Sequence, residues 1–377
     1  MSAALLALLL LQIEEPESLY QRGVEAYNAG QVDEAVRLLR TAAARRPNIP
    51  DYRYALGLAY LKSGKAKEAA SELEAVLNMT GLRRSTRVRE IDVLVQCGTA
   101  YLQLGNLKTA RNRLQVAIVR QPDQAEAHYA LGVIEQREGR PGKALEHFEA
   151  ALANQPSHAP AALASATLLR EQGKLAEALE RLRGAARLDS GSFEVQMALG
   201  QAAFEAGLLD EASSAFELAL GVAPADRNAR FNLGTALLAR KEYAKAIETL
   251  EPLLASGEPR AAFNLVQAYR GAGRTADARR VLEALAERSP EHPNLQLTLG
   301  FLREETGDLE GAEEAYRREI GLRPQTLAAY LNLAALLEKR GRKPEAIEQL
   351  KLALERAPDG PQAEKIRYAV AALEKAR

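Results

Sequence analysis

One alanine recurs along this sequence at a nearly constant spacing of 34 residues, and a fixed period of that length restricts the chain to a repeat architecture. Seven of the nine steps are 34 residues long, the step after Ala69 is 41 and the step after Ala246 is 32. A unit of this size buries its apolar side only by stacking on its neighbours, so the period predicts one row of stacked units. The ten alanines are Ala35, Ala69, Ala110, Ala144, Ala178, Ala212, Ala246, Ala278, Ala312 and Ala346.

Three further positions recur in register with this alanine and define ten units. An inner glycine stands five residues before it in nine units, and Lys241 takes its place in unit 7: Gly30, Gly64, Gly105, Gly139, Gly173, Gly207, Gly273, Gly307 and Gly341. Seven residues earlier lies a small residue, which we call the packing position, with Val266 as the exception in unit 8: Gly23, Gly57, Gly98, Gly132, Ala166, Gly200, Gly234, Gly300 and Ala334. A proline follows the alanine by twelve residues in seven units: Pro47, Pro122, Pro156, Pro224, Pro290, Pro324 and Pro358.

Each position has a structural reason in a pair of antiparallel helices, A and B. Apolar residues recur at helical spacing on both sides of the inner glycine, as Leu131, Ile134 and Phe148 illustrate. The inner glycine is expected to end helix A, where a positive φ is needed. The small residue at the packing position is expected to face the recurring alanine, so that the two helices approach closely. The proline ends helix B or opens the next unit.

These positions resemble the tetratricopeptide repeat (TPR), whose pattern joins a leucine–glycine pair, an alanine, an aromatic residue and a closing proline. The resemblance implies an all-α fold, a right-handed α-solenoid (superhelix) of antiparallel helix-turn-helix hairpins, in which helices A line a concave groove. The pattern reads Leu131-Gly132…Ala144…Phe148…Pro156, Leu199-Gly200…Ala212…Phe216…Pro224 and Leu299-Gly300…Ala312…Tyr316…Pro324.

The repeats predict the organisation of the whole chain. An apolar N-terminal segment (1–15) precedes units 1 and 2 (16–83), a basic insertion (84–90), units 3–10 (91–360) and a C-terminal capping helix (361–377). The capping helix is expected to place an apolar stripe on the array and to begin with Pro361 in its first turn. That stripe consists of Ile366, Ala369, Val370 and Leu373.

Two places interrupt the period. The insertion after unit 2 carries a cluster of arginines, either on a longer helix B or a solvated loop, or as a contact for an anion or an acidic partner. Unit 7 combines Lys241 with Pro252 inside helix B, and the proline is expected to kink or truncate that helix and bend the superhelix. The arginines proposed for the anion contact are Arg83, Arg84, Arg87 and Arg89.

The stretch from Ala3 to Leu11 contains only alanine and leucine. It matches the apolar core of a secretory signal and is too short to span a bilayer. No basic residue precedes it and no small-residue cleavage site follows, so the alternative is an extra helix packed on unit 1. We favour an exported, periplasmic location slightly over a cytoplasmic one, and the excess of arginine over lysine points weakly to a bacterial source.

The composition argues against several classes of protein. Fifty basic residues balance fifty acidic ones, so no nucleic-acid partner is expected. A single cysteine, Cys97, and four histidines form no recognisable metal site. We predict no catalytic residues, no cofactor, no metal site and no membrane span, and we expect that the chain is not an enzyme.

The groove on helices A remains as the place for recognition. Three residues before the packing position, every unit carries a large apolar or aromatic side chain, and asparagine follows it in units 7, 8 and 10. In TPR relatives, asparagines at this place contact the backbone of an extended peptide, because an amide both donates and accepts hydrogen bonds. The alternative is that these side chains pack between units. The candidates are Tyr20, Tyr54, Tyr129, Phe231, Asn232, Phe263, Asn264, Leu331 and Asn332.

We therefore expect a non-catalytic scaffold that binds a protein or extended peptide segment in its concave groove and organises a multiprotein assembly. Acidic groove candidates outnumber basic ones, which favours a basic or neutral peptide over an acidic one. The alternative is a substrate-recruiting accessory subunit of a separately encoded enzyme, such as a glycosyltransferase or a protease. The sequence does not specify the partner or the oligomeric state.

Overall fold

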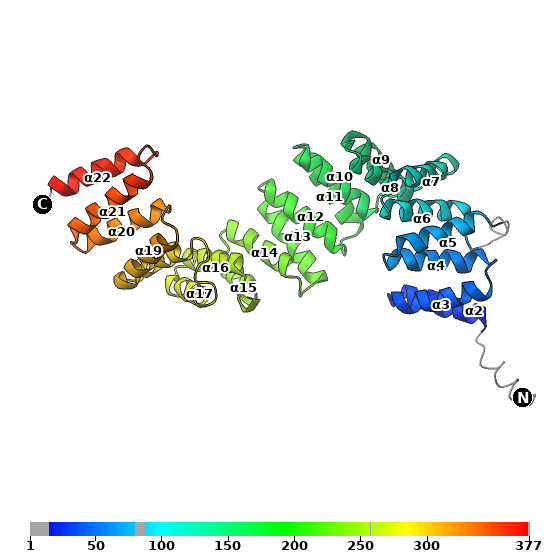
Figure 1. The fold of residues 1–377 in the computed structure, drawn as a ribbon, viewed down its shortest axis with the longest axis horizontal. Helices are drawn as coiled ribbons and strands as arrows, with labels where there is room; N and C mark the ends of the chain where they lie inside the picture. Colours follow the sequence, from blue (N-terminus) through cyan, green and yellow to red (C-terminus); the bar gives the residue numbers. More distant parts are fainter. Residues whose placement is uncertain (1–14, 80–86, 257, 376–377) are drawn as a thin grey trace, which may run out of the picture. The chain divides into compact units, whose positions relative to one another are not determined.

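The computed structural model describes residues 15–79, 87–256 and 258–375, and all regular secondary structure in these ranges is helical. Consecutive helices form antiparallel pairs joined by short turns (Figure 1). The chain forms two compact bodies, Met1–Ala198 and Leu199–Arg377, which we call the N-terminal body and the C-terminal body. The prediction of an all-α helical repeat is confirmed.

The N-terminal body contains units 1 to 5, each a helix A followed by a helix B. Their bounds are α2 (Pro16–Asn28), α3 (Val32–Arg45), α4 (Pro50–Lys62), α5 (Ala66–Leu77), α6 (Glu90–Gln103), α7 (Leu107–Arg120), α8 (Ala125–Arg137), α9 (Pro141–Asn154), α10 (Ala159–Glu171) and α11 (Leu175–Leu188). Helix α12 (Phe193–Glu205), helix A of unit 6, contains the division between the bodies.

The C-terminal body continues with helix B of unit 6, units 7 to 10 and one further helix. Their bounds are α13 (Leu209–Val222), α14 (Arg227–Ala239), α15 (Tyr243–Leu250), the 3₁₀ helix η2 (Glu251–Ser256), α16 (Pro259–Gly271), α17 (Thr275–Arg288), α18 (Leu295–Glu305), α19 (Leu309–Leu322), α20 (Leu327–Lys339), α21 (Lys343–Arg356) and α22 (Ala363–Lys375).

The hydrophobic core runs between consecutive helices, so that each unit supplies one wall of its neighbour's core. Leu39 of α3 belongs to the same buried cluster as Leu56 of α4. In the C-terminal body, Tyr316 of α19 shares a buried cluster with Leu333 of α20. A single hairpin therefore leaves an apolar face exposed, and stability depends on stacking.

The turn between helix A and helix B has the same backbone geometry in all ten units. The nine inner glycines have φ between 73° and 84°. Lys241 adopts the same left-handed conformation, with φ 63°, although a side chain is disfavoured there. The place of a residue in the repeat therefore predicts its left-handed backbone conformation better than its residue type does.

The packing position has a different nearest neighbour from the one we expected. A Cβ atom built on Gly57 would lie 2.8 Å from the side chain of Leu73, and one on Gly132 would lie 2.5 Å from Phe148. Both neighbours stand four residues after the recurring alanine. The nearest neighbour of the glycine is therefore the larger side chain one turn later, which fills the space that the missing Cβ leaves. The recurring alanine also lies close, since the carbonyl oxygen of Ala144 is 3.1 Å from the Cβ position built on Gly132.

Two irregular segments follow from proline positions. Pro252 ends the α-helical part of unit 7, because α15 stops at Leu250 and continues as the 3₁₀ helix η2. At the other end, Ile366, Val370 and Leu373 of α22 are buried on the array. Pro361 lies in the turn before α22, which begins at Ala363, so the expectation that it occupies the first helical turn is wrong.

A polar contact links helix B of one unit to the end of helix A of the next, always across 27 residues. The residue just after the recurring alanine meets the residue just before the inner-turn position. The repeat pattern does not reveal this contact, because the residue types change from one junction to another and the positive and negative partners even exchange places. The pairs are Arg111–Glu138, Ser213–Arg240, Arg279–Thr306 and Glu313–Arg340.

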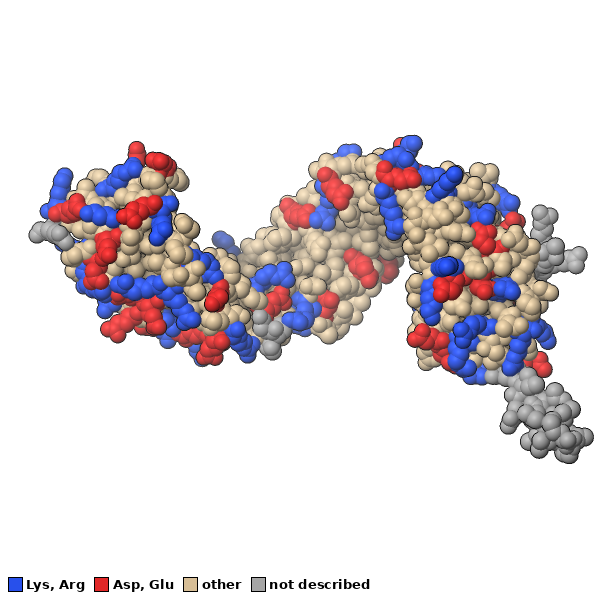
Figure 2. Space-filling view, viewed as in Figure 1, with Lys and Arg blue, Asp and Glu red and all other residues tan. Residues whose placement is uncertain are grey.

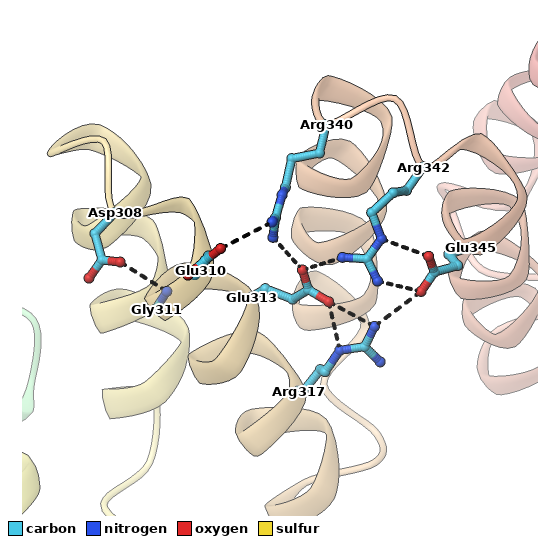
Figure 3. Close-up of polar contacts among 8 residues, drawn as sticks. All are labelled: Asp308, Glu310, Gly311, Glu313, Arg317, Arg340, Arg342 and Glu345. Atoms are coloured by element: carbon cyan, nitrogen blue, oxygen red, sulfur yellow. Dashed lines mark hydrogen bonds and ion pairs between the residues drawn. The ribbon is translucent and has the colours of Figure 1, made fainter.

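The junction between units 9 and 10 extends this contact into a network (Figure 3). Glu313 of α19, whose side chain is 13% exposed, accepts hydrogen bonds from Arg317 at 2.9 Å and from Arg340 and Arg342 at 2.6 Å. Burial acts to raise the pKa of Glu313, but Arg317 and Arg342 outweigh it and hold the pKa below its ordinary value. Glu345 binds Arg342 on the other side at 2.5 Å. Charge pairing thus reinforces the apolar contact between these units.

Candidate functional site

The nine groove candidates all lie on helices A, and each is half-buried. Three of their rings contact the residue 29 positions later, at the start of the next unit. The Tyr129 ring centre is 5.2 Å from that of His158, and the Phe263 ring centre is 5.3 Å from that of His292. The third ring, Phe231, has the guanidinium of Arg260 5.0 Å from its centre. These side chains therefore join neighbouring units and also keep part of their surface accessible.

Two of the three asparagines make hydrogen bonds within the chain. The amide of Asn264 donates to Oγ1 of Thr235 at 2.8 Å, in the preceding unit. Asn332 forms a side-chain hydrogen bond with Tyr316. These contacts give Asn264 and Asn332 a packing role, whereas the half-buried Asn232 is the better candidate for contact with a ligand.

Tyr20 and Tyr54 line a cavity of about 210 Å³ between α2 and α4. Arg87 and Val88, which belong to the basic insertion (84–90), close one side of it. Burial is the main cause that raises the pKa of Tyr54, to about 12, so its hydroxyl is neutral at physiological pH. The structure thus brings together two aromatic candidates and one arginine candidate that the sequence had assigned to separate sites.

The described arginines of the proposed anion contact are engaged with carboxylates of the chain. Arg87 lies 3.4 Å from Oε1 of Glu17, and Arg89 lies 2.6 Å from Asp92. Arg83 and Arg84 lie outside the described residues. Because both described arginines have intrachain carboxylate partners, the structure provides little support for an anion site here.

A larger hollow of about 570 Å³ lies beside Phe263, between α16 and α18. Gln267 and Thr298 supply polar groups to its lining, which Gly271 also borders. Arg270 forms one rim, where it lies 4.7 Å above the ring centre of Phe301 and 3.1 Å from Glu305. Phe301, which the sequence pattern did not single out, is 39% exposed on a helix A.

Several carboxylates of the groove form ion pairs with neighbouring basic groups. Glu304 lies 3.4 Å from Lys339. Basic and acidic side chains are also intermixed on the face drawn in Figure 2. Part of the acidic charge of the groove is therefore balanced within the chain. Further pairs are Asp92–Arg89 and Glu305–Arg270.

The titratable groups outside the groove form contacts within the chain. Cys97 is buried, and burial is the main cause that raises the pKa of its thiol to about 12, so it is a poor nucleophile. The Nδ1 atoms of His128 and His147 lie 3.2 Å apart in one hairpin. His158 accepts a hydrogen bond from the Ala161 amide at Nδ1, so its Nε2–H donates to Glu126 at 3.0 Å.

The residues that the structure covers offer neither a metal site nor a membrane span. Within these ranges, no three side chains of His, Cys, Asp or Glu gather closely enough to hold a metal ion. None of the helices described is both long and apolar enough to cross a bilayer. The apolar segment Ala3–Leu11 lies outside the described residues, so the prediction of a signal peptide stays untested.

The geometry is that of a helical-hairpin repeat with an accessible face on helices A. The chain belongs to the tetratricopeptide repeat family, because models of this repeat match well over half of it. Matches to one model cover residues 20–80, 98–159, 197–261, 263–326 and 302–361. Matches to a second cover residues 136–202 and 169–224. A comparison with curated proteins gives no match.

Several solved structures are similar to parts of the chain. A structure described as the functional characterization of Pseudomonas aeruginosa PilF is 26% identical over 53% of this chain and 92% of its own, with a TM-score of 0.42. The MamA RS-1 ArsTM double mutant is 26% identical over 43% of this chain and 92% of its own, with a TM-score of 0.40. A tetratricopeptide repeat protein from Parabacteroides merdae is 16% identical over 75% of this chain and 98% of its own, with a TM-score of 0.36.

Proposed function

We propose that this protein is a non-catalytic scaffold that binds an extended, mainly uncharged segment of a partner protein along its helices A. Membership of the TPR family supports a protein-interaction role in general. The observation that carries the finer proposal is the hollow beside Phe263, where apolar surface and polar side chains occur together on the groove face.

The lining of this hollow has the chemistry that an extended peptide requires. The amide of Gln267 can donate to a peptide carbonyl and accept from a peptide N–H whatever the sequence of the peptide. Phe263 offers aromatic surface to its side chains. The charge of Arg270 is balanced by Glu305, so the site favours a neutral segment over a charged one.

A second candidate is a substrate-recruiting accessory subunit for a separately encoded enzyme, such as a glycosyltransferase or a protease. The same groove serves both functions, since recruitment also depends on peptide binding. Mixing the chain with a captured enzyme distinguishes them, because only the accessory subunit changes that enzyme's turnover of a protein substrate.

The test begins with affinity capture from native lysate and continues with the affinity of the purified partner for variants. Gln267→Ala is expected to weaken binding about fivefold, since a net hydrogen bond contributes about 1 kcal/mol. Gln201→Ala is the matched control, because Gln201 holds the same repeat position in unit 6 and does not line the hollow. Equal affinities for the wild type and Gln267→Ala would contradict the proposal.

The asparagines separate binding from packing. Asn264→Ala is expected to lower the unfolding free energy by about 1 kcal/mol, since it removes the hydrogen bond to Thr235. Asn232→Ala is expected to weaken binding of the partner while leaving the urea-unfolding midpoint nearly unchanged. If Asn232→Ala lowers the midpoint as much as Asn264→Ala, then Asn232 is a packing residue.

A further inference from the structure

The cavity of units 1 and 2 is enclosed by a contact between residues far apart in the sequence. Arg87 reaches Glu17, which lies 70 residues earlier, and its guanidinium stands 5.9 Å from the Tyr20 ring centre. Val88 is only 5% exposed and belongs to the buried cluster of units 2 and 3. The chain therefore returns over the face of α2 and α4 at this point and turns a stretch of groove into a pocket.

The lining of this cavity is suited to an apolar group. Rings of Tyr20, Tyr27 and Tyr54 and aliphatic side chains such as Val24 and Leu58 surround it. An apolar cavity of about 150 Å³ is large enough to hold benzene. The volume of about 210 Å³ therefore accommodates one aromatic or large aliphatic side chain.

The charged groups around the cavity already contact other groups of the chain. Arg87 lies beside Glu17, which also accepts a hydrogen bond from Tyr52 at 2.8 Å. Lys62 lies 4.6 Å from the Tyr27 ring centre and donates to the Tyr27 carbonyl. A charged ligand would have to compete with these contacts, whereas an uncharged apolar ligand leaves them in place.

We propose that the cavity between α2, α4 and residues 87–88 is an anchor pocket for one uncharged aromatic or large aliphatic side chain of a partner peptide. The proposal rests on the proposed function, since it specifies what the scaffold recognises in units 1 and 2. The flanking peptide backbone would lie along helices A, outside the pocket.

The absence of tryptophan from the chain permits a direct test with a tryptophan probe. The probe is the peptide acetyl-Ala-Ala-Trp-Ala-Ala-amide, excited where tyrosine does not absorb. We expect a saturable rise in anisotropy with a blue shift of the emission, because the indole leaves water. The peptide is expected to bind more tightly than N-acetyl-tryptophanamide, and replacement of its outer alanines by Glu or by Lys is expected to bring no gain.

Two variants locate the binding. Ala55→Leu fills the cavity from its wall and is expected to weaken the peptide at least about tenfold, which equals about 1.4 kcal/mol. Ala164→Leu is the matched control at the same repeat position of unit 5. Arg87→Ala removes one side of the pocket and is also expected to weaken binding of the peptide. It remains informative if Ala55→Leu fails to fold, because the Arg87 side chain is 59% exposed. Arg89→Ala is its control.

Several results would overturn the proposal. The first is the absence of saturable binding, and the second is wild-type affinity for the peptide in both Ala55→Leu and Arg87→Ala. The third is tighter binding of a charged peptide. The fourth is that N-acetyl-tryptophanamide binds while the peptide does not. The last result would indicate a site for a free small molecule. These results would contradict the pocket proposal alone. The scaffold proposal is tested separately, because Gln267→Ala measures partner binding in the C-terminal body.

Discussion

Units 2 and 8 use the same repeat positions but place their close-packing glycine differently. Unit 2 has Gly57 at the packing position and Lys62 five residues later, whereas unit 8 has Val266 and Gly271. Gly57 admits Leu73 of its own helix B, and Gly271 admits the Tyr243 ring of the preceding unit. The glycine therefore determines which neighbour approaches helix A.

The surfaces of the two units differ as well. In unit 2 the candidate Tyr54 lines a cavity that Arg87 and Val88 help to close, while in unit 8 the equivalent Phe263 borders a larger hollow. The comparison shows that a repeat position predicts which helix carries a side chain and whether it is half-buried. It does not predict whether the surface above that side chain is covered.

The largest expected effect comes from adding a methyl group at either glycine. Gly57→Ala and Gly271→Ala should each destabilise the chain by about 1–3 kcal/mol, because each Cβ overlaps a packed side chain. Urea unfolding measures the effect, and hydrogen exchange locates it in unit 2 or in units 7 and 8.

The matched control for both substitutions is Gly184→Ala. Gly184 lies inside α11, and no neighbouring side chain stands within 4 Å of the point that its Cβ would occupy. Helix propensity should therefore stabilise this variant by about 0.5–1 kcal/mol. Destabilisation of Gly184→Ala to the same extent would show that close approach is not what the two glycines provide.

The next effect concerns the inner turns of the two regions. Lys241→Gly should stabilise unit 7 by about 1 kcal/mol, because it removes a side chain from a left-handed backbone conformation. Gly64→Ala should destabilise unit 2 by a similar amount for the opposite reason. Thermal melting of both variants checks the pair, and a change of the same sign in both would refute this explanation.

The smallest expected effect is a pH dependence of the closed pocket. The pKa of Glu17 lies below its ordinary value, first because Tyr52 donates to the carboxylate and then because Arg87 stands beside it. A lowered folded-state pKa means that this stabilisation is complete well above pH 4.5 and is lost as the pH falls through the folded-state pKa.

Hydrogen exchange at Val88 measures this closure. Its protection is expected to fall on acidification in the wild type and to be lower at neutral pH in Glu17→Gln. In unit 8, Gln267 provides the comparison amide, because its surroundings do not involve Glu17. Protection of Val88 that is unchanged in Glu17→Gln would show that the Arg87–Glu17 contact does not hold the pocket closed.

The sequence predicted the parts of the fold that depend on local backbone geometry. The 34-residue period located the inner-turn position of all ten units, which is left-handed even at Lys241, but it did not locate the left-handed Asn294. Pro252 ended the α-helix of unit 7 as expected. These features were predictable because turn conformation and proline sterics act within a few residues.

The candidate site was predicted less completely. Helical periodicity placed Tyr54 and Phe263 on helices A, but it gave no indication that Arg87 reaches Glu17 across 70 residues. The partner of Gly57 was missed because the repeat positions do not specify side-chain directions. Phe301 was missed because the residue type at its position varies among units.

The 27-residue contacts have a consequence for how such a gene can change. The junction of units 3 and 4 joins Arg111 to Glu138, while the junction of units 9 and 10 joins Glu313 to Arg340. Recombination between similar repeats that brought the helix B of unit 3 next to unit 10 would set Arg111 against Arg340. Like charges at such a junction repel each other and destabilise the rearranged array. Deletions and duplications that change the order of the units are therefore disfavoured.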